Sequence, residues 1–450
     1  MMSLAEAAAA MQGVLKGVDG RFSGVSTDSR SVGAGELFVA IRGERFDGHA
    51  FLDMSQARGA SAAVVDGAFA SSAPLPVVSV DDTRRALGRL GRHWRGRFAP
   101  VVIAIAGANG KTTTKEMLAS ILRAHAGEEA VLATQGNLNT DIGVPMTVLR
   151  LNAAHRFCAV ELGMNHPGEI AGLAAIAQPT VAVVTNAQRE HMEFMKSVEA
   201  SAAENAEALR ALPPEGIAVL NADDACRAIF AAAAGALRIV EFGLKAAATV
   251  SGGYSLKALS SEIVLRAPDG EARATLAIPG LHNVRNALAA AACAHAAGVP
   301  VATIARGLAA FRPYAGRLQV KRSRAGATLL DDSYNANPDS VRAAIDVLAA
   351  CAAPTVLALG DMGEVGEQGP AYHREVGAYA RERGIGALFS LGEASRGAST
   401  AFGAGGRHFS SPEALAAALP PGATVLVKGS RFMRMERVVA ALTGENGGTH

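Results

Sequence analysis

Four apolar runs without alternation constrain the fold of this chain more than any other feature. The first, "VVIAIAG", begins at Val101, and "FCAVELG", "VAVVTNA" and "GIAVLNAD" follow it. Uninterrupted runs of β-branched and apolar residues are typical of strands buried on both faces of a parallel sheet. Helical segments lie between the runs, so the spacing predicts a doubly wound α/β domain.

The alternation of strands and helices returns in the last third of the chain, from "ATLLDDSY" to "ATVLVKGS". This part has Rossmann-like character but no G-x-G-x-x-G, so we infer no dinucleotide site. The N-terminal part contains short strands and then a helix that leads to a boundary near Pro100. We therefore expect an α/β protein of three domains, covering residues 1–98, 99–312 and 313–450.

Composition excludes several classes of protein. Half of the residues are hydrophobic and the formal net charge is +2, which argues against global disorder and against a nucleic-acid partner. The four cysteines are far apart in the sequence, so free buried thiols are expected rather than structural zinc or disulfides. The N-terminus is typical of a short amphipathic helix and not of a signal peptide, and the alanine-rich stretch 287–309 is expected to be a packed helix. We expect a cytoplasmic protein without a membrane partner.

A glycine-rich loop, "GANGKTT", follows the first apolar run directly. A strand, a glycine loop and then a helix, expected to begin at about Thr113, form the context of a phosphate site, although the first glycine of the common P-loop pattern is missing. Loop N–H groups point at the anion, Lys111 neutralises phosphate charge, and the Thr112 hydroxyl is suited to Mg²⁺. The alternative is a strand-to-helix turn that binds nothing.

Two further side chains follow buried strands. Glu161 ends "FCAVE", and His191 lies just past "VAVVTNA". Ligands of an open α/β sheet bind at the carboxyl ends of its strands, so we expect both residues to converge with the loop and to bind Mg²⁺ there. Taken alone, each is equally well explained as a surface capping residue.

Several longer motifs resemble those of one family. "GANGKTTTKEML", "TQGNLNTDIGVPMTVL", "DDSYNANPDS" and "VLVKGSRFMRME" occur in the order typical of the Mur ligases of bacterial cell-wall synthesis. The shortened loop is shared across Mur ligases and folylpolyglutamate synthases, whereas "GNLNTDIGVP" and "DDSYNANPDS" resemble the D-Ala-D-Ala-adding branch. The resemblance implies an N-terminal UDP-substrate domain, a central P-loop ATPase domain and a C-terminal Rossmann-like domain.

The resemblance also implies which residues contact ATP and which catalyse. Lys111, Glu161 and His191 would be catalytic, with Thr112, Glu161 and His191 as Mg²⁺ ligands. From the residues alone, Asn283 is equally well a helix N-cap. The implied nucleotide contacts are Gly107, Asn109, Gly110, Lys111, Thr112, Thr113, His282, Asn283, Asn286, Arg317, Asp332, Tyr334 and Asn335.

The substrate residues implied by the resemblance lie in all three domains. In the N-terminal domain, "STDSR" could equally be a solvated Asx turn on physical grounds. The UDP contacts would be Ser26, Thr27, Asp28, Ser29, Arg30, Arg42, Gly43, Asp47, Gly48 and His49. The muramoyl-peptide would meet Thr134, Asn137, Asn139 and Thr140, and Lys428, Ser430 and Arg431 would face the dipeptide carboxylate. Asn337 is also expected to contact substrate, from a stretch that would touch the nucleotide.

One position departs from the family pattern. Many Mur ligases carry a lysine whose carbamate bridges two Mg²⁺ ions, and alignment of "SVEASAAENAEAL" on Ser197 and Glu199 puts Asn205 at that position. A carbamylated lysine is therefore excluded there, although the Asn205 carbonyl could face a metal or its water. We expect the second Mg²⁺ to depend on His191, Glu161 and substrate oxygens, and activity to be independent of added bicarbonate.

The implied reaction is ATP-dependent joining of D-Ala-D-Ala to UDP-N-acetylmuramoyl-tripeptide through an acyl phosphate, giving ADP and phosphate. We expect a monomer, because one chain suffices for this reaction. The third residue of the tripeptide, lysine or diaminopimelate, and the general base stay open. The alternatives are another Mur ligase, a folylpolyglutamate synthase, a P-loop ATPase switch or a non-catalytic nucleotide-binding scaffold.

Overall fold

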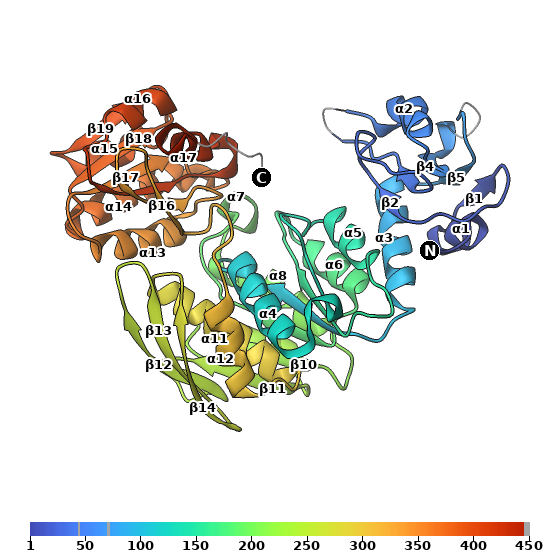
Figure 1. The fold of residues 1–450 in the computed structure, drawn as a ribbon, viewed down its shortest axis with the longest axis horizontal. Helices are drawn as coiled ribbons and strands as arrows, with labels where there is room; N and C mark the ends of the chain where they lie inside the picture. Colours follow the sequence, from blue (N-terminus) through green and yellow to red (C-terminus); the bar gives the residue numbers. More distant parts are fainter. Residues whose placement is uncertain (44–45, 70–72, 445–450) are drawn as a thin grey trace. The chain divides into compact units, whose positions relative to one another are not determined.

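The computed structural model describes residues 1–43, 46–69 and 73–444 as two compact units (Figure 1). The first comprises Met1–Ala104, Glu129–Met164 and Gly168–Thr180, and the second comprises Ile105–Glu128, Asn165–Pro167 and Val181–His450. The mixed α/β class expected from the sequence is confirmed. The expected domain ranges include undescribed residues, and their boundaries stay predictions.

The N-terminal part of the first unit is built on a sheet of order β1-β5-β4-β3-β2. β1 pairs antiparallel with β5, and the remaining neighbours are parallel. The expected strands at "LFV" and "AAVVD" and the expected helix after them are present. The elements are α1 (Leu4–Met11), β1 (Val14–Lys16), β2 (Val25–Ser26), β3 (Leu37–Val39), α2 (Leu52–Ala57), β4 (Ala62–Asp66), β5 (Val77–Val80) and α3 (Thr83–Arg95).

Helix α3 fixes the N-terminal sheet to the rest of the first unit. Its N-terminal end is capped by the Asp82 side chain, and Trp94 and Arg95 of its last turn are buried. The Trp94 indole N–H donates to Leu151 O at 3.0 Å, and the Arg95 guanidinium donates to Ala177 O and Gln178 O, both at 3.1 Å. The sequence predicted a surface helix, but these buried polar contacts make α3 a structural link within the unit.

The remaining strands of the first unit have the order β6-β8-β7. β8 is buried at every position, as its continuous apolar sequence predicted. The elements are β6 (Val101–Ala106, whose last two residues belong to the second unit), β7 (Val131–Ala133), α5 (Gly143–Val148), β8 (Phe157–Glu161) and α6 (Glu169–Ala177).

The second unit begins at the end of β6, with the glycine-rich loop 107–110 (the nucleotide loop), and contains two sheets. The first has the order β14-β13-β12-β11-β10-β9, parallel from β9 to β12 and antiparallel from β12 to β14. Its elements are α4 (Lys111–Ala126), β9 (Val181–Val184), α7 (Met192–Met195), α8 (Val198–Asn205), α9 (Glu207–Arg210), β10 (Ile217–Asn221), α10 (Arg227–Ala234), β11 (Arg238–Gly243), β12 (Val250–Leu256), β13 (Ser261–Ala267), β14 (Gly270–Leu276), α11 (Leu281–Ala296) and α12 (Val301–Ala310).

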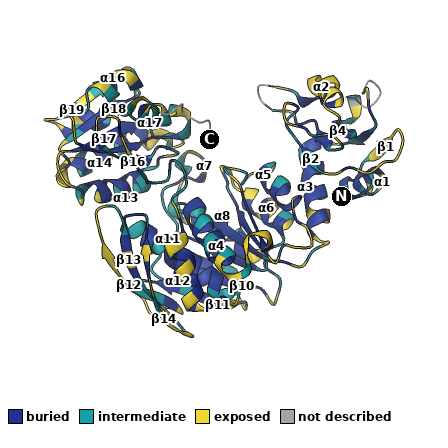
Figure 2. Ribbon diagram, in the orientation of Figure 1, coloured by how far each residue is buried: buried dark blue, intermediate teal, exposed yellow. Residues whose placement is uncertain are grey.

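Three helices cover this sheet together. α4, α11 and α12 lie side by side (Figure 1), and α11 is buried along most of its length (Figure 2). The alanine-rich stretch predicted as one packed helix is two helices, because the chain turns at Gly298 and Pro300 forms the N-cap of α12. Among the described residues, no helix is long and apolar enough to cross a membrane.

The C-terminal part of the second unit is a sheet of order β15-β16-β20-β17-β18-β19 with one antiparallel edge strand, β15. Helices α13 and α14 lie on one side of it and α16 and α17 on the other (Figure 1). The elements are β15 (Gln319–Arg322), β16 (Thr328–Asp332), α13 (Pro338–Ala349), β17 (Thr355–Gly360), α14 (Gly369–Glu382), β18 (Ala387–Leu391), α15 (Arg396–Phe402), β19 (Gly406–Phe409), α16 (Pro412–Ala417), β20 (Thr424–Lys428) and α17 (Glu436–Thr443).

The cysteines are free, as expected. Cys158, Cys226 and Cys293 are buried, and burial raises the pKa of the Cys158 thiol to about 12. Cys351 is only partly buried, which differs from the expectation. Inert, protonated thiols are consistent with a packing role for the buried cysteines.

Candidate active site

The loop between β6 and α4 depends on two glycines. Gly107 and Gly110 have φ of +120° and +82°. A Cβ atom on Gly107 would lie 2.3 Å from Thr185 Oγ1, and one on Gly110 would lie 2.1 Å from Asn286 Oδ1. Any other residue at either position would combine an unfavourable backbone conformation with a clash. Helix α4 begins at Lys111, two residues before the expected start, so the lysine and Thr112 belong to its first turn.

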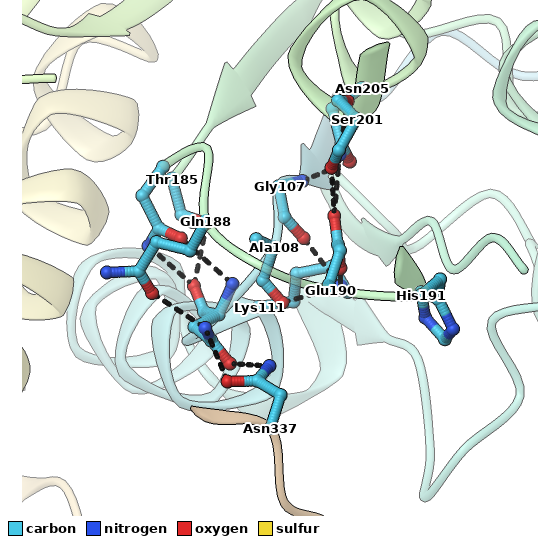
Figure 3. A network of polar contacts seen from close by, with 12 residues as sticks. Gly107, Ala108, Lys111, Thr185, Gln188, Glu190, His191, Ser201, Asn205 and Asn337 are labelled. Carbon is cyan, nitrogen blue, oxygen red and sulfur yellow. Dashed lines mark hydrogen bonds and ion pairs between the residues drawn. The ribbon is translucent and has the colours of Figure 1, made fainter. Parts of the chain in front are cut away.

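Lys111 is folded back onto its own loop. Its ammonium donates to Gly107 O at 2.5 Å and Ala108 O at 3.2 Å, and it lies 3.4 Å from Glu190 Oε2 (Figure 3). Three oxygens therefore surround this cation where phosphate oxygens would be expected. Of the carboxylates named in the sequence analysis, none makes this contact, and Glu190 was missed.

Asn109 connects the loop to two distant segments, residues 186–188 and Asn337. Its backbone N–H and carbonyl bond to the Asn186 side chain at 3.0 and 2.9 Å. Its side-chain amide donates to Gln188 at 2.6 Å and exchanges hydrogen bonds with Asn337, with Asn337 Nδ2 donating to Asn109 Oδ1 at 2.9 Å. Asn337, which was expected on the substrate side, therefore lies at the nucleotide loop, where it also caps α13.

Arg317 reaches the same helix start from the C-terminal region. It donates to Thr112 Oγ1 at 3.1 Å, and its guanidinium lies over the Tyr334 ring at 4.1 Å from the ring centroid. The structure thus brings together Thr112, Arg317 and Tyr334, three of the expected nucleotide contacts. Thr113 is buried in the same turn of α4.

The start of α11 also faces the loop. Asn286 donates to Asn283 Oδ1 at 3.1 Å, and Asn283 donates to Pro279 O at 2.8 Å. Asn283 is not the N-cap, a possibility left open by the sequence, because the cap is Gly280. Burial lowers the pKa of His282 to about 4, so its ring is neutral near pH 7.

The ends of β16 and β20 hold the remaining C-terminal residues. Lys428 is buried and donates to Asp332 Oδ2 at 2.6 Å and Asn335 O at 2.8 Å. The Ser430 hydroxyl accepts from the Gly363 N–H at 2.7 Å, and Arg431 pairs with Glu436 at 2.8 Å. Lys428 and Arg431 are therefore cations with protein partners, and their binding of a substrate carboxylate stays a prediction.

His191 faces away from Lys111 and Glu190 (Figure 3). Its Nδ1 atom lies 2.7 Å from Glu364 Oε2, and this hydrogen bond lowers the pKa of the Glu364 carboxyl. Arg189, two positions before His191, donates to Asp339 through Nε and Nη2 and to Glu375 Oε2 through Nη1 at 2.8 Å. Arg189 and His191 thus join the segment after β9 to the C-terminal region.

The peptide-side residues form a group within the first unit. The Glu161 carboxylate is buried and accepts from Asn139 Nδ2 at 2.9 Å, while its backbone N–H donates to Thr134 Oγ1 at 3.0 Å. Asn139 N–H donates to Asn137 O, and Thr140 O accepts from Val144 N–H at the approach to α5. Because Glu161 belongs to the first unit and Lys111 and His191 to the second, its convergence with them stays a prediction.

The expected UDP residues make short-range contacts. Asp28 accepts from the Arg30 backbone and pairs with its guanidinium at 2.8 Å, which lowers the pKa of the Asp28 carboxyl to about 2. This is the Asx turn weighed above, with Ser26, Thr27 and Ser29 around it. Arg42 pairs with Asp47 at 3.1 Å, and the buried His49 ring bonds Asp47 beside Gly48. The Gly43 N–H donates to Phe46 O.

Family models match most of the chain in three segments. They are described as the Mur ligase family catalytic domain (residues 21–95), the Mur ligase middle domain (105–294) and the Mur ligase glutamate ligase domain (316–431). The UDP-N-acetylmuramoyl-tripeptide–D-alanyl-D-alanine ligase of Escherichia coli K12 is 40% identical over 97% of both chains. This chain belongs to the Mur ligase family.

Solved structures of Mur ligases share the whole fold. A crystal structure of MurF from Acinetobacter baumannii has a TM-score of 0.89 at 33% identity and covers 98% of both chains. MurF from Thermotoga maritima in complex with ADP has a TM-score of 0.80 at 25% identity, covering 94% of this chain and 97% of that one. The three-sheet arrangement is therefore that of MurF structures, as the resemblance implied.

The donor atoms around the loop of this Mur ligase fit a hard divalent cation. The Thr112 hydroxyl and the Glu190 carboxylate are oxygen donors beside the phosphate loop, and such donors suit Mg²⁺, which keeps part of its shell for phosphate and water. No group of three or more His, Cys, Asp or Glu side chains suited to a metal occurs within the described ranges. This finding is compatible with a Mg²⁺ ion that takes most of its ligands from the nucleotide phosphates and water.

Asn205 makes two contacts that the sequence did not suggest. Its side-chain oxygen accepts from Gly107 N–H at 2.7 Å, and its amide nitrogen donates to Glu190 Oε1 at 2.8 Å (Figure 3). The carbonyl that was expected to face a metal is therefore engaged by the loop. Glu190 could have been suspected from its place directly before His191, but only the fold shows that it points to Lys111.

Proposed function

We propose that this Mur ligase joins D-alanyl-D-alanine to the terminal carboxylate of UDP-N-acetylmuramoyl-tripeptide, using ATP and releasing ADP and phosphate in peptidoglycan precursor synthesis. The observation that carries the proposal is the Gly107–Lys111 loop in a chain 40% identical to such a ligase over 97% of its length. Residues 1–98 bind the UDP end, residues 99–312 bind ATP, and residues 313–450 complete the site over the nucleotide.

ATP is needed because a carboxylate is a poor electrophile at neutral pH. Transfer of the γ-phosphoryl group to the tripeptide carboxylate gives an acyl phosphate, and the dipeptide amine attacks its carbonyl carbon. The tetrahedral intermediate then expels phosphate as the amide forms. Positioning and neutralisation of charge supply most of the catalysis in a phosphoryl transfer, and Lys111 is the cation placed for it.

Mg²⁺ bound with ATP would neutralise phosphate charge. Thr112 lies at the loop and would hold it, whereas Glu161 and His191 stay the ligands that the family resemblance implies. The segments that carry Asn337 and Arg317 meet the loop from the C-terminal region, which suits exclusion of water from an acyl phosphate that water would destroy. Thr134, Asn137, Asn139 and Thr140 would orient the peptide, and Lys428, Ser430 and Arg431 the dipeptide. We expect a cytoplasmic monomer.

A phosphate-release assay with omissions tests the proposal. Purified chain is incubated with ATP, D-Ala-D-Ala and the UDP-tripeptide in its lysine and diaminopimelate forms, and each component is omitted in turn. Phosphate release is expected only with all three present. Release that ignores the dipeptide would indicate an ATPase switch, and release with glutamate in place of the dipeptide would indicate a folylpolyglutamate synthase-like ligase.

A further inference from the structure

The Glu190 carboxylate is held rigidly beside the nucleotide loop. It is 4% exposed. Its Oε1 atom accepts from Asn205 Nδ2 at 2.8 Å and from Ser201 Oγ at 2.9 Å, and its Oε2 atom faces Lys111 Nζ at 3.4 Å (Figure 3). Two donors thus occupy one oxygen and fix the plane of the carboxylate, so that the second oxygen points at the phosphate-binding lysine.

Asn205 has the chemistry that this arrangement requires. Its oxygen accepts from Gly107 N–H and its nitrogen donates to Glu190, so both ends of the amide are used. A lysine at this position would lack the acceptor for Gly107. An aspartate would lack the donor and would bring a second carboxylate against the first. Asn205 therefore ties the position of the Glu190 carboxylate to the first glycine of the loop.

Lys111 neutralises Glu190 only while the loop carries no phosphate. Its ammonium is shared among Glu190 and two loop carbonyls, at Gly107 and Ala108. A triphosphate bound by the loop is a stronger partner than a single carboxylate at 3.4 Å. Once Lys111 turns to the phosphates, Glu190 is a buried carboxylate without its counter-charge, which is a costly state for a protein.

We propose that Glu190 is a cation-binding carboxylate of the nucleotide site and that Asn205 and Ser201 position it. Glu190 binds Lys111 when the loop is empty and binds the divalent cation of the bound nucleotide once Lys111 has turned to the phosphates. The cation arrives with the triphosphate and prefers carboxylate oxygens. The inference rests on the proposed function only in that the chain binds a metal–nucleotide complex, and it is independent of the acceptor.

The test separates binding of the cation from binding of the nucleotide. Mn²⁺ is titrated into the full chain with adenylyl imidodiphosphate, and free Mn²⁺ is followed by electron paramagnetic resonance. The affinity for the same nucleotide in EDTA is measured by calorimetry. For Glu190→Gln we expect about tenfold weaker Mn²⁺ binding in the ternary complex. Nucleotide affinity in EDTA is expected to stay the same or rise, because Lys111 loses a competing partner.

Two other variants sharpen the result. Asn205→Ala keeps the Glu190 carboxylate but removes its support, so Mn²⁺ affinity is expected to fall with less change in nucleotide affinity. Glu199→Gln removes the same charge from an exposed position in the first turn of α8 and should behave as the unaltered protein.

Two outcomes would overturn the proposal. Unchanged Mn²⁺ affinity in Glu190→Gln would mean that the cation does not use this carboxylate. Equal losses of Mn²⁺ and metal-free nucleotide binding would assign Glu190 to support of the loop alone. If Glu190→Gln does not give the melting temperature of the unaltered protein, Glu190→Asp serves instead: it keeps the charge but shortens the reach, and its Mn²⁺ affinity should still fall. Neither measurement uses an acceptor substrate, so the binding results can be interpreted even if the ligase assay fails.

Discussion

The nucleotide loop and the expected UDP turn are built in opposite ways. Around the loop, Gly107 bonds Asn205, Asn109 bonds Asn337 and Thr112 bonds Arg317, so each contact joins parts of the chain that are far apart in sequence. In the N-terminal turn, Asp28 bonds Arg30 and Arg42 bonds Asp47, which are near neighbours. The first geometry exists only in the folded chain, whereas the second is largely fixed by local sequence.

The contrast predicts different responses to mutation. Changes around the loop should affect both chemistry and the joining of distant segments. Changes in the N-terminal turn should affect substrate affinity while leaving the rest of the molecule unaltered. Four measurements test this difference.

Lys111→Ala is expected to have the largest effect. Loss of a preorganised cation at the transferring phosphoryl group should lower kcat by about 10²–10³-fold or more. The chain should still fold, with a lower melting temperature because Glu190 loses its counter-charge. Phosphate release with both acceptor substrates measures this. Lys257→Ala, at an exposed lysine in a weak pair with Glu262, is the matched control, and near-normal turnover by Lys111→Ala would contradict the assignment of the loop.

Arg189→Ala removes the fork that binds Asp339 and Glu375. Because both carboxylates are partly buried, we expect a loss of about 1–3 kcal/mol in the free energy of unfolding. Chemical denaturation measures it. Arg383→Ala breaks an exposed pair with Asp346 and should lower the free energy of unfolding by no more than about 1 kcal/mol. Equal losses in the two variants would show that the Arg189 ion pairs stabilise the fold no more than an exposed pair does.

Asp28→Ala tests the N-terminal turn. If the turn binds the UDP end, losing the Asp28 contacts should raise the KM for the UDP-tripeptide roughly tenfold and leave the KM for ATP unchanged. Initial-rate kinetics with each substrate varied separately give both values. A parallel rise in both would mean that the turn supports the fold and does not select a substrate.

The smallest expected effect is a dependence of stability on pH through His282. Its folded-state pKa is about 4 because of burial, below the ordinary value of 6.5. The unfolded chain therefore takes up a proton first, and stability is lost as the pH falls from 6.5 toward 4. Denaturation at pH 7, 6 and 5 should show the stability difference between the unaltered protein and His282→Gln shrinking as the pH falls. A constant difference would mean that the surroundings of His282 do not lower its pKa.

Sequence patterns predicted the parts of the fold that follow from continuous burial. β6, β8, β9 and β10 are buried strands because their residues are apolar on both faces. The antiparallel strands β12 to β14 were missed. β12 contains the glycine pair of "VSGGYSL" and is exposed toward its end, and β13 and the end of β14 alternate buried with more exposed residues. Such strands resemble loops until their partners are known.

The candidate site was predictable where one motif supplies several residues. The loop glycines, Lys111 and Thr112 lie within six positions and carry their own signature. Glu190 carries none: its role follows from Ser201, Asn205 and Lys111, which the fold brings to it. The contact between Asn109 and Asn337 was not predictable for the same reason, because contacts over hundreds of positions leave no local pattern.

The chain has a single tryptophan, and it is Trp94 of α3. Its indole is almost fully buried and bonded to Leu151 O, with Arg97 over the ring at 5.2 Å. Intrinsic fluorescence excited at the indole band therefore comes from one place, the attachment of the N-terminal sheet to its neighbouring strands. The native protein thus carries its own unlabelled optical reporter, which would register detachment of that sheet while remaining insensitive to events confined to the nucleotide loop.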